Sequence, residues 1–351
     1  MKHTDNYYKQ RELDCLNKID DILKDLPPMV YEFIVGKTDY TSPLTRLNYS
    51  RDLRIFFEFL IKYKFRNKNK IDITLADLET LDLTDFEAFM AHLSHYFIND
   101  KEEICNEAAK ARKLAAVRAF FKYFFNKGKI SSNVPAKLSL PKLHEKEIIR
   151  LDFNEISRLV DLCETGSNLS ERQRAYHKNT KIRDVAIITL FLGTGIRNSE
   201  LVGLNVSDVN FEDMSFVVTR KGGNRTILYF NDEVKKALLD WVEYRKTIKN
   251  LDAKEKALFL SLQNSRITTR AIQQLVKKYA KVVTPLKKIT PHKLRSTFGT
   301  NLYHETNDIY LVADFLGHSD VNTTKKHYAA MSEDLRRKAI KSVKIKDDEN
   351  D

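Results

Sequence analysis

Six residues in the second half of the chain have side chains that suit chemistry at a phosphodiester. In chain order they are Arg197, Lys221, His292, Arg295, His318 and Tyr328. Arginine can hold the charged oxygens of a phosphate with fixed, planar donors, and histidine can donate a hydrogen bond or move a proton near neutral pH. A tyrosine hydroxyl can act as a nucleophile and form a covalent intermediate. The set therefore predicts cleavage of a phosphodiester through a phosphotyrosyl bond.

Arg197 lies in the segment GTGIRNSEL, residues 193–201, shortly after two glycines. Such a turn lets the backbone leave a helix and aim one side chain into a cleft. The alternative is that Arg197 only begins a helix and pairs locally with Glu200, three residues further on.

His292 and Arg295 belong to the segment TPHKLRSTF, residues 290–298. Thr290 is typical of a helix N-cap and Pro291 of the first helical residue. Residues three apart share one face of a helix, and the free N–H groups of a helix N-terminus favour an anion. We therefore expect both side chains to face a phosphate.

The other three residues each have an ordinary alternative. Lys221 precedes Gly222-Gly223 in a hairpin and could be a surface lysine, His318 could be a solvated helix cap, and Tyr328 could be a buried structural tyrosine. Their places in the order of the six residues favour a catalytic role for each.

The ordered set Arg, Lys, His-x-x-Arg, His, Tyr resembles the active site of the tyrosine site-specific recombinases. The resemblance implies that Arg197 and Arg295 bind the scissile phosphate, with Glu200 in support. It also implies that Lys221 protonates the departing 5′ oxygen and that Tyr328 is the nucleophile. Ser296 stands where many relatives have a second histidine, and Tyr328 follows His318 by ten residues where many relatives have nine.

Longer segments are similar to the Xer branch of this family, and most similar to its single-recombinase XerS type. They are RDVAIITLFLGTGIRNSELVGLNVSDVN, VTRKGG and VTPHKLRSTF. The resemblance implies resolution of chromosome or plasmid dimers at a short inverted-repeat site in double-stranded DNA, with a partition protein as a possible regulator. An integrase or excisionase of a phage or mobile element has the same six residues, so it stays an alternative. Two further alternative functions are a topoisomerase with the same chemistry and a non-catalytic DNA-binding regulator.

Composition agrees with a DNA partner. The chain has 351 residues, a length that predicts two domains, and a formal net charge of +12, which favours an anionic partner. No apolar run is long enough for a membrane span, and no signal segment is found. The three cysteines lie far apart, which predicts a reducing cytoplasm and neither disulfide nor zinc site. Because no phosphate-binding glycine motif occurs and His92 and His95 have no third ligand, we expect no cofactor and no metal.

The expected fold is mainly α with a small β-sheet, an α+β catalytic domain within a two-domain DNA clamp of the recombinase type. The expected domains are a helical extension (1–37), a SAM-like helical DNA-binding domain (38–127), a linker (128–146), a catalytic domain (147–343) and a charged tail (344–351).

In the N-terminal helices, several basic residues lie outside the apolar stripe of their helix. Helices are expected from Ser42-Pro43, after a Thr84–Glu87 capping box, and over 106–127. The basic residues expected to contact DNA phosphates are Arg51, Arg54, Lys110, Arg112, Lys113 and Arg118. Arg46 is expected to be available in the same way.

In the C-terminal half, 183–192 is apolar nearly all round and predicts a buried helix. Strands are expected at 215–220 and 225–230, joined by KGGN, with later helices at 232–248, 268–281, 291–304, 308–316 and 321–340. The apolar positions of 332–343 predict docking on a neighbouring subunit, and the resemblance implies a homotetramer on two DNA sites.

Overall fold

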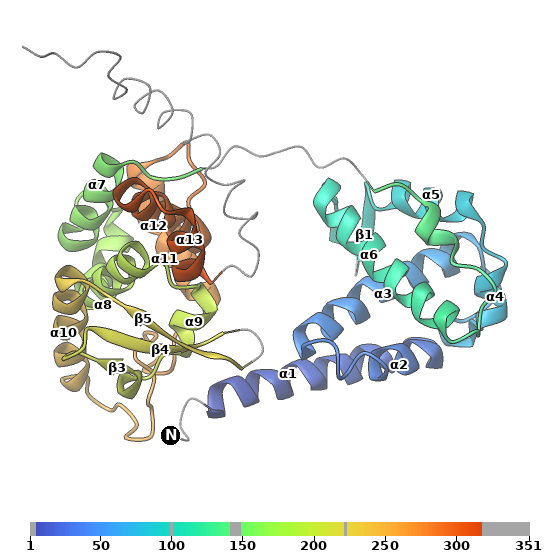
Figure 1. Cartoon of the computed structure of the whole chain (residues 1–351), viewed down its shortest axis with the longest axis horizontal. Coiled ribbons are helices and arrows are strands. Elements are labelled where there is room, and N and C mark those ends of the chain that lie inside the picture. Colours follow the sequence, from blue (N-terminus) through green and yellow to red (C-terminus); the bar gives the residue numbers. More distant parts are fainter. Residues whose placement is uncertain (1–4, 99–100, 141–148, 221–222, 318–351) are drawn as a thin grey trace, which may run out of the picture. The chain divides into compact units, whose positions relative to one another are not determined.

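The computed structural model describes residues 5–98, 101–140, 149–220 and 223–317. The chain divides into two compact units, Met1–Lys146 and Glu147–Asp351, which we describe separately (Figure 1). Both are mainly helical and each holds a small antiparallel sheet, so the expected fold class is confirmed. Among the described helices, none combines the length and apolar character needed to cross a membrane.

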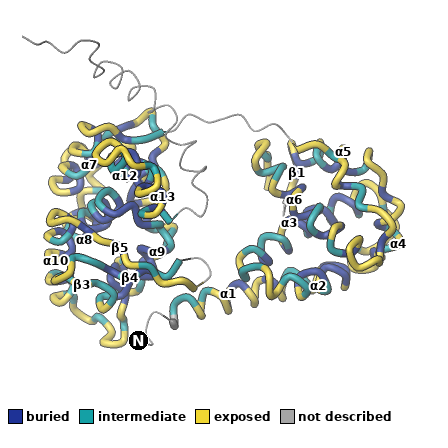
Figure 2. The backbone as a smooth tube through the Cα atoms, viewed as in Figure 1, coloured by how far each residue is buried: buried dark blue, intermediate teal, exposed yellow. Residues whose placement is uncertain are grey.

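The N-terminal unit consists of six helices and a short hairpin within the described residues. They are α1 (Asp5–Leu23), α2 (Pro28–Val35), α3 (Pro43–Tyr63), α4 (Leu75–Glu79), α5 (Leu83–His92), β1 (Tyr96–Ile98), β2 (Lys101–Glu103) and α6 (Glu107–Asn126). Phenylalanines from α3, α5 and α6 meet edge to face in its core; Phe56, for example, contacts both Phe89 and Phe121. Figure 2 shows the buried sides of α3 and α6 turned toward each other.

Local sequence explains where these helices begin. Ser42 caps α3 by accepting a hydrogen bond from the backbone N–H of Thr45, as predicted. The predicted Thr84–Glu87 capping box is wrong, because α5 begins two residues earlier. Asp82 and Asp85 form the box instead, since an aspartate in the N3 position can reach back to the N-cap N–H.

The first part of the predicted linker belongs to the N-terminal unit. Ile130 is buried in its core, and the 3₁₀ turn Val134–Lys137 packs against α6. Arg118 fastens this segment by donating to the carbonyls of Pro135 and Leu138. Residues 128–138 are therefore not a free linker; their turn-rich composition concealed three apolar side chains that reach the core.

The C-terminal unit is arranged around one long helix. Its described elements are α7 (Phe153–Thr165), α8 (Glu171–Thr194), α9 (Asn198–Gly203), β3 (Val209–Asn210), β4 (Ser215–Thr219), β5 (Arg225–Tyr229), α10 (Asp232–Lys246), α11 (Thr269–Val283), α12 (Pro291–Thr306) and α13 (Ile309–Leu316). Helix α8 packs against α7, α10 and α12 (Figure 1). The predicted buried helix 183–192 forms its C-terminal half, while its polar N-terminal half begins at a Ser170–Gln173 capping box.

The sheet has the order β3-β4-β5 and is antiparallel throughout. The predicted hairpin is confirmed: Thr219 pairs with Arg225 at its turn end. The short strand β3 and the β1–β2 hairpin were not predicted, because strands of two or three residues are too short to show a period-2 pattern. The helix predicted at 321–340 lies outside the described residues.

Candidate active site

Arg197 is held at the point where the chain leaves α8. The helix ends at Gly195 in a left-handed conformation with φ +61°, and Arg197 is the N-cap of α9. Its Nη1 lies 2.9 Å from Oε1 of Glu200, and Oε2 of Glu200 accepts the Arg197 backbone N–H at 3.0 Å. Since Glu200 is only 4% exposed, this pair fixes the direction of the guanidinium. The local pairing considered from sequence is real, and it leaves the Nη2 end of Arg197 for other partners.

Arg295 and Arg197 both donate hydrogen bonds to the C-terminal end of α13. Arg197 Nη2 donates to the carbonyl oxygens of Leu316 (3.1 Å) and Gly317 (2.9 Å). Arg295, 4% exposed on α12, donates to the carbonyls of Leu316 and Gly195. Two arginines 98 positions apart in sequence thus share the Leu316 carbonyl.

Arg220 is a third arginine at the same place, and sequence reasoning passed it over in favour of Lys221. It follows β4, and its Nη2 donates to the carbonyl of Phe315 at 3.3 Å. Burial lowers the pKa of the Arg220 guanidinium, Glu200 raises it, and the nearby Arg197 lowers it further. The resemblance assigns the hairpin role to Lys221 because that residue directly precedes Gly222-Gly223, and no local signal marked its neighbour Arg220.

His292 lies on the first turn of α12, one turn before Arg295, and is exposed. Thr290 caps this helix as predicted and accepts the backbone N–H of Lys293. Lys221, His318 and Tyr328 lie outside the described residues, so their roles stay predictions.

The assembled arginines suit a phosphodiester. Guanidinium groups are permanent cations that only donate, and here they occupy neutral carbonyl acceptors at a helix C-terminus. Phosphate oxygens would give stronger, charge-assisted hydrogen bonds in place of these carbonyls. Two carboxylates, Glu200 and Asp314, act on the three guanidiniums, so the cluster keeps a net positive charge.

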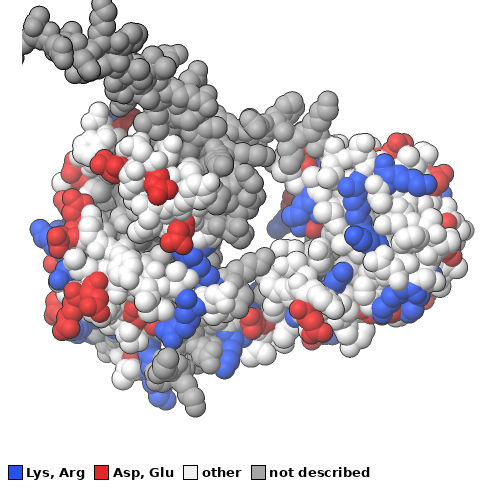
Figure 3. Space-filling model, in the orientation of Figure 1, with Lys and Arg blue, Asp and Glu red and all other residues white. Residues whose placement is uncertain are grey.

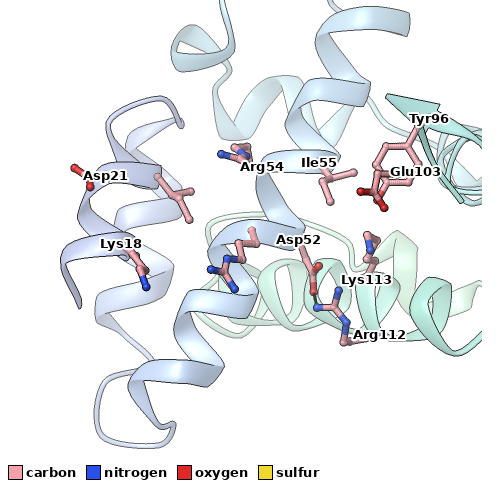
Figure 4. Close-up of a pocket in the computed structure, with 11 residues that line it drawn as sticks. Lys18, Asp21, Asp52, Arg54, Ile55, Tyr96, Glu103, Arg112 and Lys113 are labelled. Carbon is pink, nitrogen blue, oxygen red and sulfur yellow. Dashed lines mark hydrogen bonds and ion pairs between the residues drawn. The ribbon is translucent and has the colours of Figure 1, made fainter. Parts of the chain in front are cut away.

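Four of the six basic residues predicted for DNA contact line one hollow of the N-terminal unit, about 560 Å³ in volume. They are Arg51, Arg54, Arg112 and Lys113. Figure 4 shows Lys18 and Asp21 of α1 on one side of this hollow and Tyr96 and Glu103 of the β1–β2 hairpin on the other. On the face drawn in Figure 3, Lys and Arg side chains form several patches over this unit.

The hollow also contains acidic groups. Arg112 pairs with Asp52, whose side chain is buried, and burial raises the pKa of that carboxyl although Arg112 and Lys113 oppose the shift. Lys113 itself is only 6% exposed. The expectation that it lies off the buried side of α6 is therefore wrong: Lys113 lines the hollow together with Asp52, Tyr96 and Glu103.

The remaining basic residues have protein partners. Lys110 donates to Ser94 Oγ at 2.7 Å, and Arg118 holds the segment after α6. Arg46 was expected to be available for phosphates, but it is 8% exposed and donates to Thr38 Oγ1. The turn before α3 brings Thr38 to the guanidinium, so its position on the helix did not by itself leave Arg46 available.

Within the described part of the chain, no three His, Cys, Asp or Glu side chains are grouped so that they could hold a metal ion. His92 packs against the rings of Phe59 and Tyr63, and His95 contacts Glu102 at 2.7 Å.

Known proteins resemble the chain over most of its length. Residues 149–334 match the phage integrase family. The tyrosine recombinase XerC of Caldanaerobacter subterraneus subsp. tengcongensis is 33% identical, covering 95% of this chain and 90% of that protein. The tyrosine recombinase XerS of Streptococcus agalactiae is 31% identical, covering 90% of this chain and 95% of that one.

Solved structures share the fold. XerH recombinase bound to a palindromic difH substrate superposes with a TM-score of 0.65 at 18% identity, covering 94% of this chain and 88% of that chain. The Tn1549 transposon integrase in complex with transposon right end DNA gives a TM-score of 0.62 at 18% identity, covering 88% of this chain and 98% of that one. The family match and the similarity to two tyrosine recombinases show what the chain is: it is a member of the phage integrase family, a tyrosine recombinase that breaks and rejoins DNA.

Proposed function

We propose that the chain is a Xer-type site-specific recombinase that resolves chromosome or plasmid dimers through a 3′-phosphotyrosyl intermediate. One observation carries the proposal: Arg197 and Arg295 converge on the carbonyl of Leu316, two residues before His318. The similarity to XerC and XerS proteins over at least 90% of the chain supports the Xer role over that of a mobile-element integrase.

In the proposed reaction, Arg197 and Arg295 exchange their carbonyl partners for the oxygens of the scissile phosphate, while Glu200 keeps Arg197 in place. The Tyr328 oxygen attacks phosphorus, and the bond from phosphorus to the 5′ oxygen breaks. One of the two histidines, His292 or His318, accepts the tyrosine proton, and Lys221 gives a proton to the 5′ oxygen. A 5′ hydroxyl from another strand then reverses these steps, so no external energy source is needed.

The proposed assembly is a homotetramer on two duplexes, each with a short inverted-repeat site. The two units clamp the DNA, and the hollow that holds Arg51 and Arg112 faces flanking phosphates. The predicted helix at 332–343 docks on a neighbouring subunit and couples the active sites. The proposed location is the cytoplasm, with a partition protein as regulator; Cys15, Cys105 and Cys163 are free thiols, which agrees with a reducing compartment.

A nicked suicide substrate tests the chemistry. Incubation with DNA that carries the cognate site should give an adduct that resists denaturation, and Tyr328→Phe should abolish it. Tyr176→Phe, at a half-exposed tyrosine of α8, is the matched control and should leave the adduct yield unchanged.

The same experiment separates the other functions. An adduct at full yield with Tyr328→Phe removes Tyr328 as nucleophile. A protein that keeps its whole cellular function without Tyr328 is a DNA-binding regulator, and one that relaxes plasmids lacking any special site is a topoisomerase.

A further inference from the structure

One side chain joins the β4–β5 hairpin to the C-terminal end of α13. Arg220 begins the hairpin turn: its N–H donates to the carbonyl of Asn224 at 2.8 Å, and its own carbonyl accepts the N–H of Gly223 at 3.1 Å. Its guanidinium crosses to α13, 95 positions along the chain, and donates to the carbonyl of Phe315. The backbone of Arg220 is thus held by the turn while its side chain is held by another element.

The partner end of this bridge is shaped to receive a guanidinium. Gly317 ends α13 with φ +56°, a conformation that favours glycine. A Cβ at position 317 would collide with the Arg220 guanidinium, so glycine is also needed for this close approach. A side chain at position 317 would therefore strain the backbone and push the Arg220 guanidinium away from the end of α13.

Three arginines therefore hold three successive carbonyls. Arg220 donates to the carbonyl of Phe315. The carbonyl of Leu316 accepts from both Arg197 and Arg295, and that of Gly317 accepts from Arg197. Among the described atoms, the Arg220 Nε is buried and has no hydrogen-bond partner.

We propose that Arg220 is a positioning residue for strand cleavage, which fastens the hairpin to the end of α13. Arg220 directly precedes Lys221, and Gly317 directly precedes His318. A bridge between Arg220 and this helix end therefore fixes the backbone next to two residues with proposed roles in proton transfer. The inference rests on the proposed function, because it acts through Lys221 as the general acid.

The first test compares two leaving groups. Losing a positioned general acid removes a factor of about 10²–10⁴, and loss of its positioning should remove part of that, on the order of 10–100-fold. Arg220→Ala should slow cleavage of ordinary DNA by this amount. On a 5′-bridging phosphorothiolate, whose sulfur leaves without a proton, the deficit should largely disappear, and site binding should change little on either DNA.

Arg220→Lys is the matched variant. Lysine keeps the charge but has a single rotatable ammonium in place of the planar fork, so it should show most of the alanine variant's defect with the same rescue. A deficit of equal size on both substrates overturns the proposal, because Arg220 would then act on the phosphate itself or on folding. Full activity of the lysine variant also overturns it, since charge alone would then suffice.

A second measurement does not depend on Lys221. Hydrogen exchange without DNA should become faster in Arg220→Ala both at 223–230 and at 309–317, while 232–246 in α10 stays unchanged. Unchanged exchange at 309–317 overturns the fastening. Lys221→Ala is assayed in parallel on both substrates: if sulfur fails to rescue that variant, the general-acid assignment fails, whereas the exchange result still decides whether Arg220 joins the two elements.

Discussion

At the scale of single residues, the site depends on which acceptors the arginines use. Arg197 has two kinds of partner, the carboxylate of Glu200 and the carbonyls at the end of α13. The carboxylate is buried and orients the side chain, while the carbonyls are neutral and can be replaced by a phosphate. Pairing with Glu200 and binding of phosphate are therefore compatible, although the sequence presented them as alternatives.

Arg197→Ala and Arg295→Ala should impair cleavage far more than binding. A preorganised donor aimed at developing charge typically contributes a factor of about 10²–10³ in rate, whereas many contacts share the binding of DNA. Single-turnover cleavage and gel-shift affinity on the same site measure both quantities. Arg158→Ala, at an exposed arginine of α7, should change neither. Equal losses of cleavage and affinity would make the two arginines simple phosphate anchors.

At the scale of elements, a buried ion cluster holds α8 against α11. Asp184 of α8 is 1% exposed and contacts Arg183, Lys278 and the Tyr279 hydroxyl. Burial by itself would raise the pKa of Asp184, but Arg183 and Lys278 outweigh it and hold that pKa below its ordinary value. Because α8 ends at the turn that presents Arg197, this cluster fixes the element on which the site depends.

Asp184→Asn should destabilise the catalytic unit by about 3–5 kcal/mol at pH 7, since removing one partner of a buried pair leaves the others uncompensated. A lowered carboxyl pKa stabilises the fold above the unfolded value, about 3.9, and this contribution is lost as pH falls through the folded value. The difference in the free energy of unfolding between the unchanged protein and the variant should therefore have its full size at pH 7 and shrink below about pH 4.

Denaturant unfolding followed by Trp241 fluorescence measures this gap. Trp241, the single tryptophan, is buried in α10 and so reports on the catalytic unit alone. Asp240→Asn, at an exposed position of the same helix, should change stability little. A gap that stays constant with pH would show that Asp184 contributes by packing and not by charge.

At the scale of the whole molecule, the chain consists of two units with separate cores. The N-terminal core extends past α6, because Ile130 is buried in it and Val134 and Leu138 pack against it. A boundary placed at the end of α6 would therefore cut through a packed region.

A fragment ending at Leu140 should fold cooperatively and bind duplex DNA weakly, with an affinity that falls steeply as salt rises, because phosphate contacts release counterions. A fragment ending at Lys127 should unfold at a lower urea concentration, since it lacks the segment that Arg118 fastens. Circular dichroism in urea and fluorescence anisotropy across a salt series measure the two properties. Equal urea midpoints would mean that residues 128–140 add nothing to the core, and salt-independent binding would remove the hollow around Arg51 and Arg112 from the DNA interface.

Fold class, most helix starts, the hairpin and the family could all be predicted from the sequence, because these depend on local signals. The cap at Ser42, the Asp152–Glu155 box that begins α7 and the Thr290-Pro291 helix start are set by neighbours within a few residues. The order of the six candidate catalytic residues can likewise be seen in the sequence without the fold.

Which basic side chains are available, and which converge, depends on how the elements pack and could not be predicted from the sequence. Lys113 and Arg46 lie on helices whose pattern places them outward, yet both side chains are buried, and Arg46 donates to Thr38 in the loop before α3. Arg220 reaches the end of α13 across 95 positions, and no local pattern records such a contact. The physical reason is the same in each case: side-chain burial and long-range hydrogen bonds depend on how elements pack, whereas caps and turns depend on the few residues that form them.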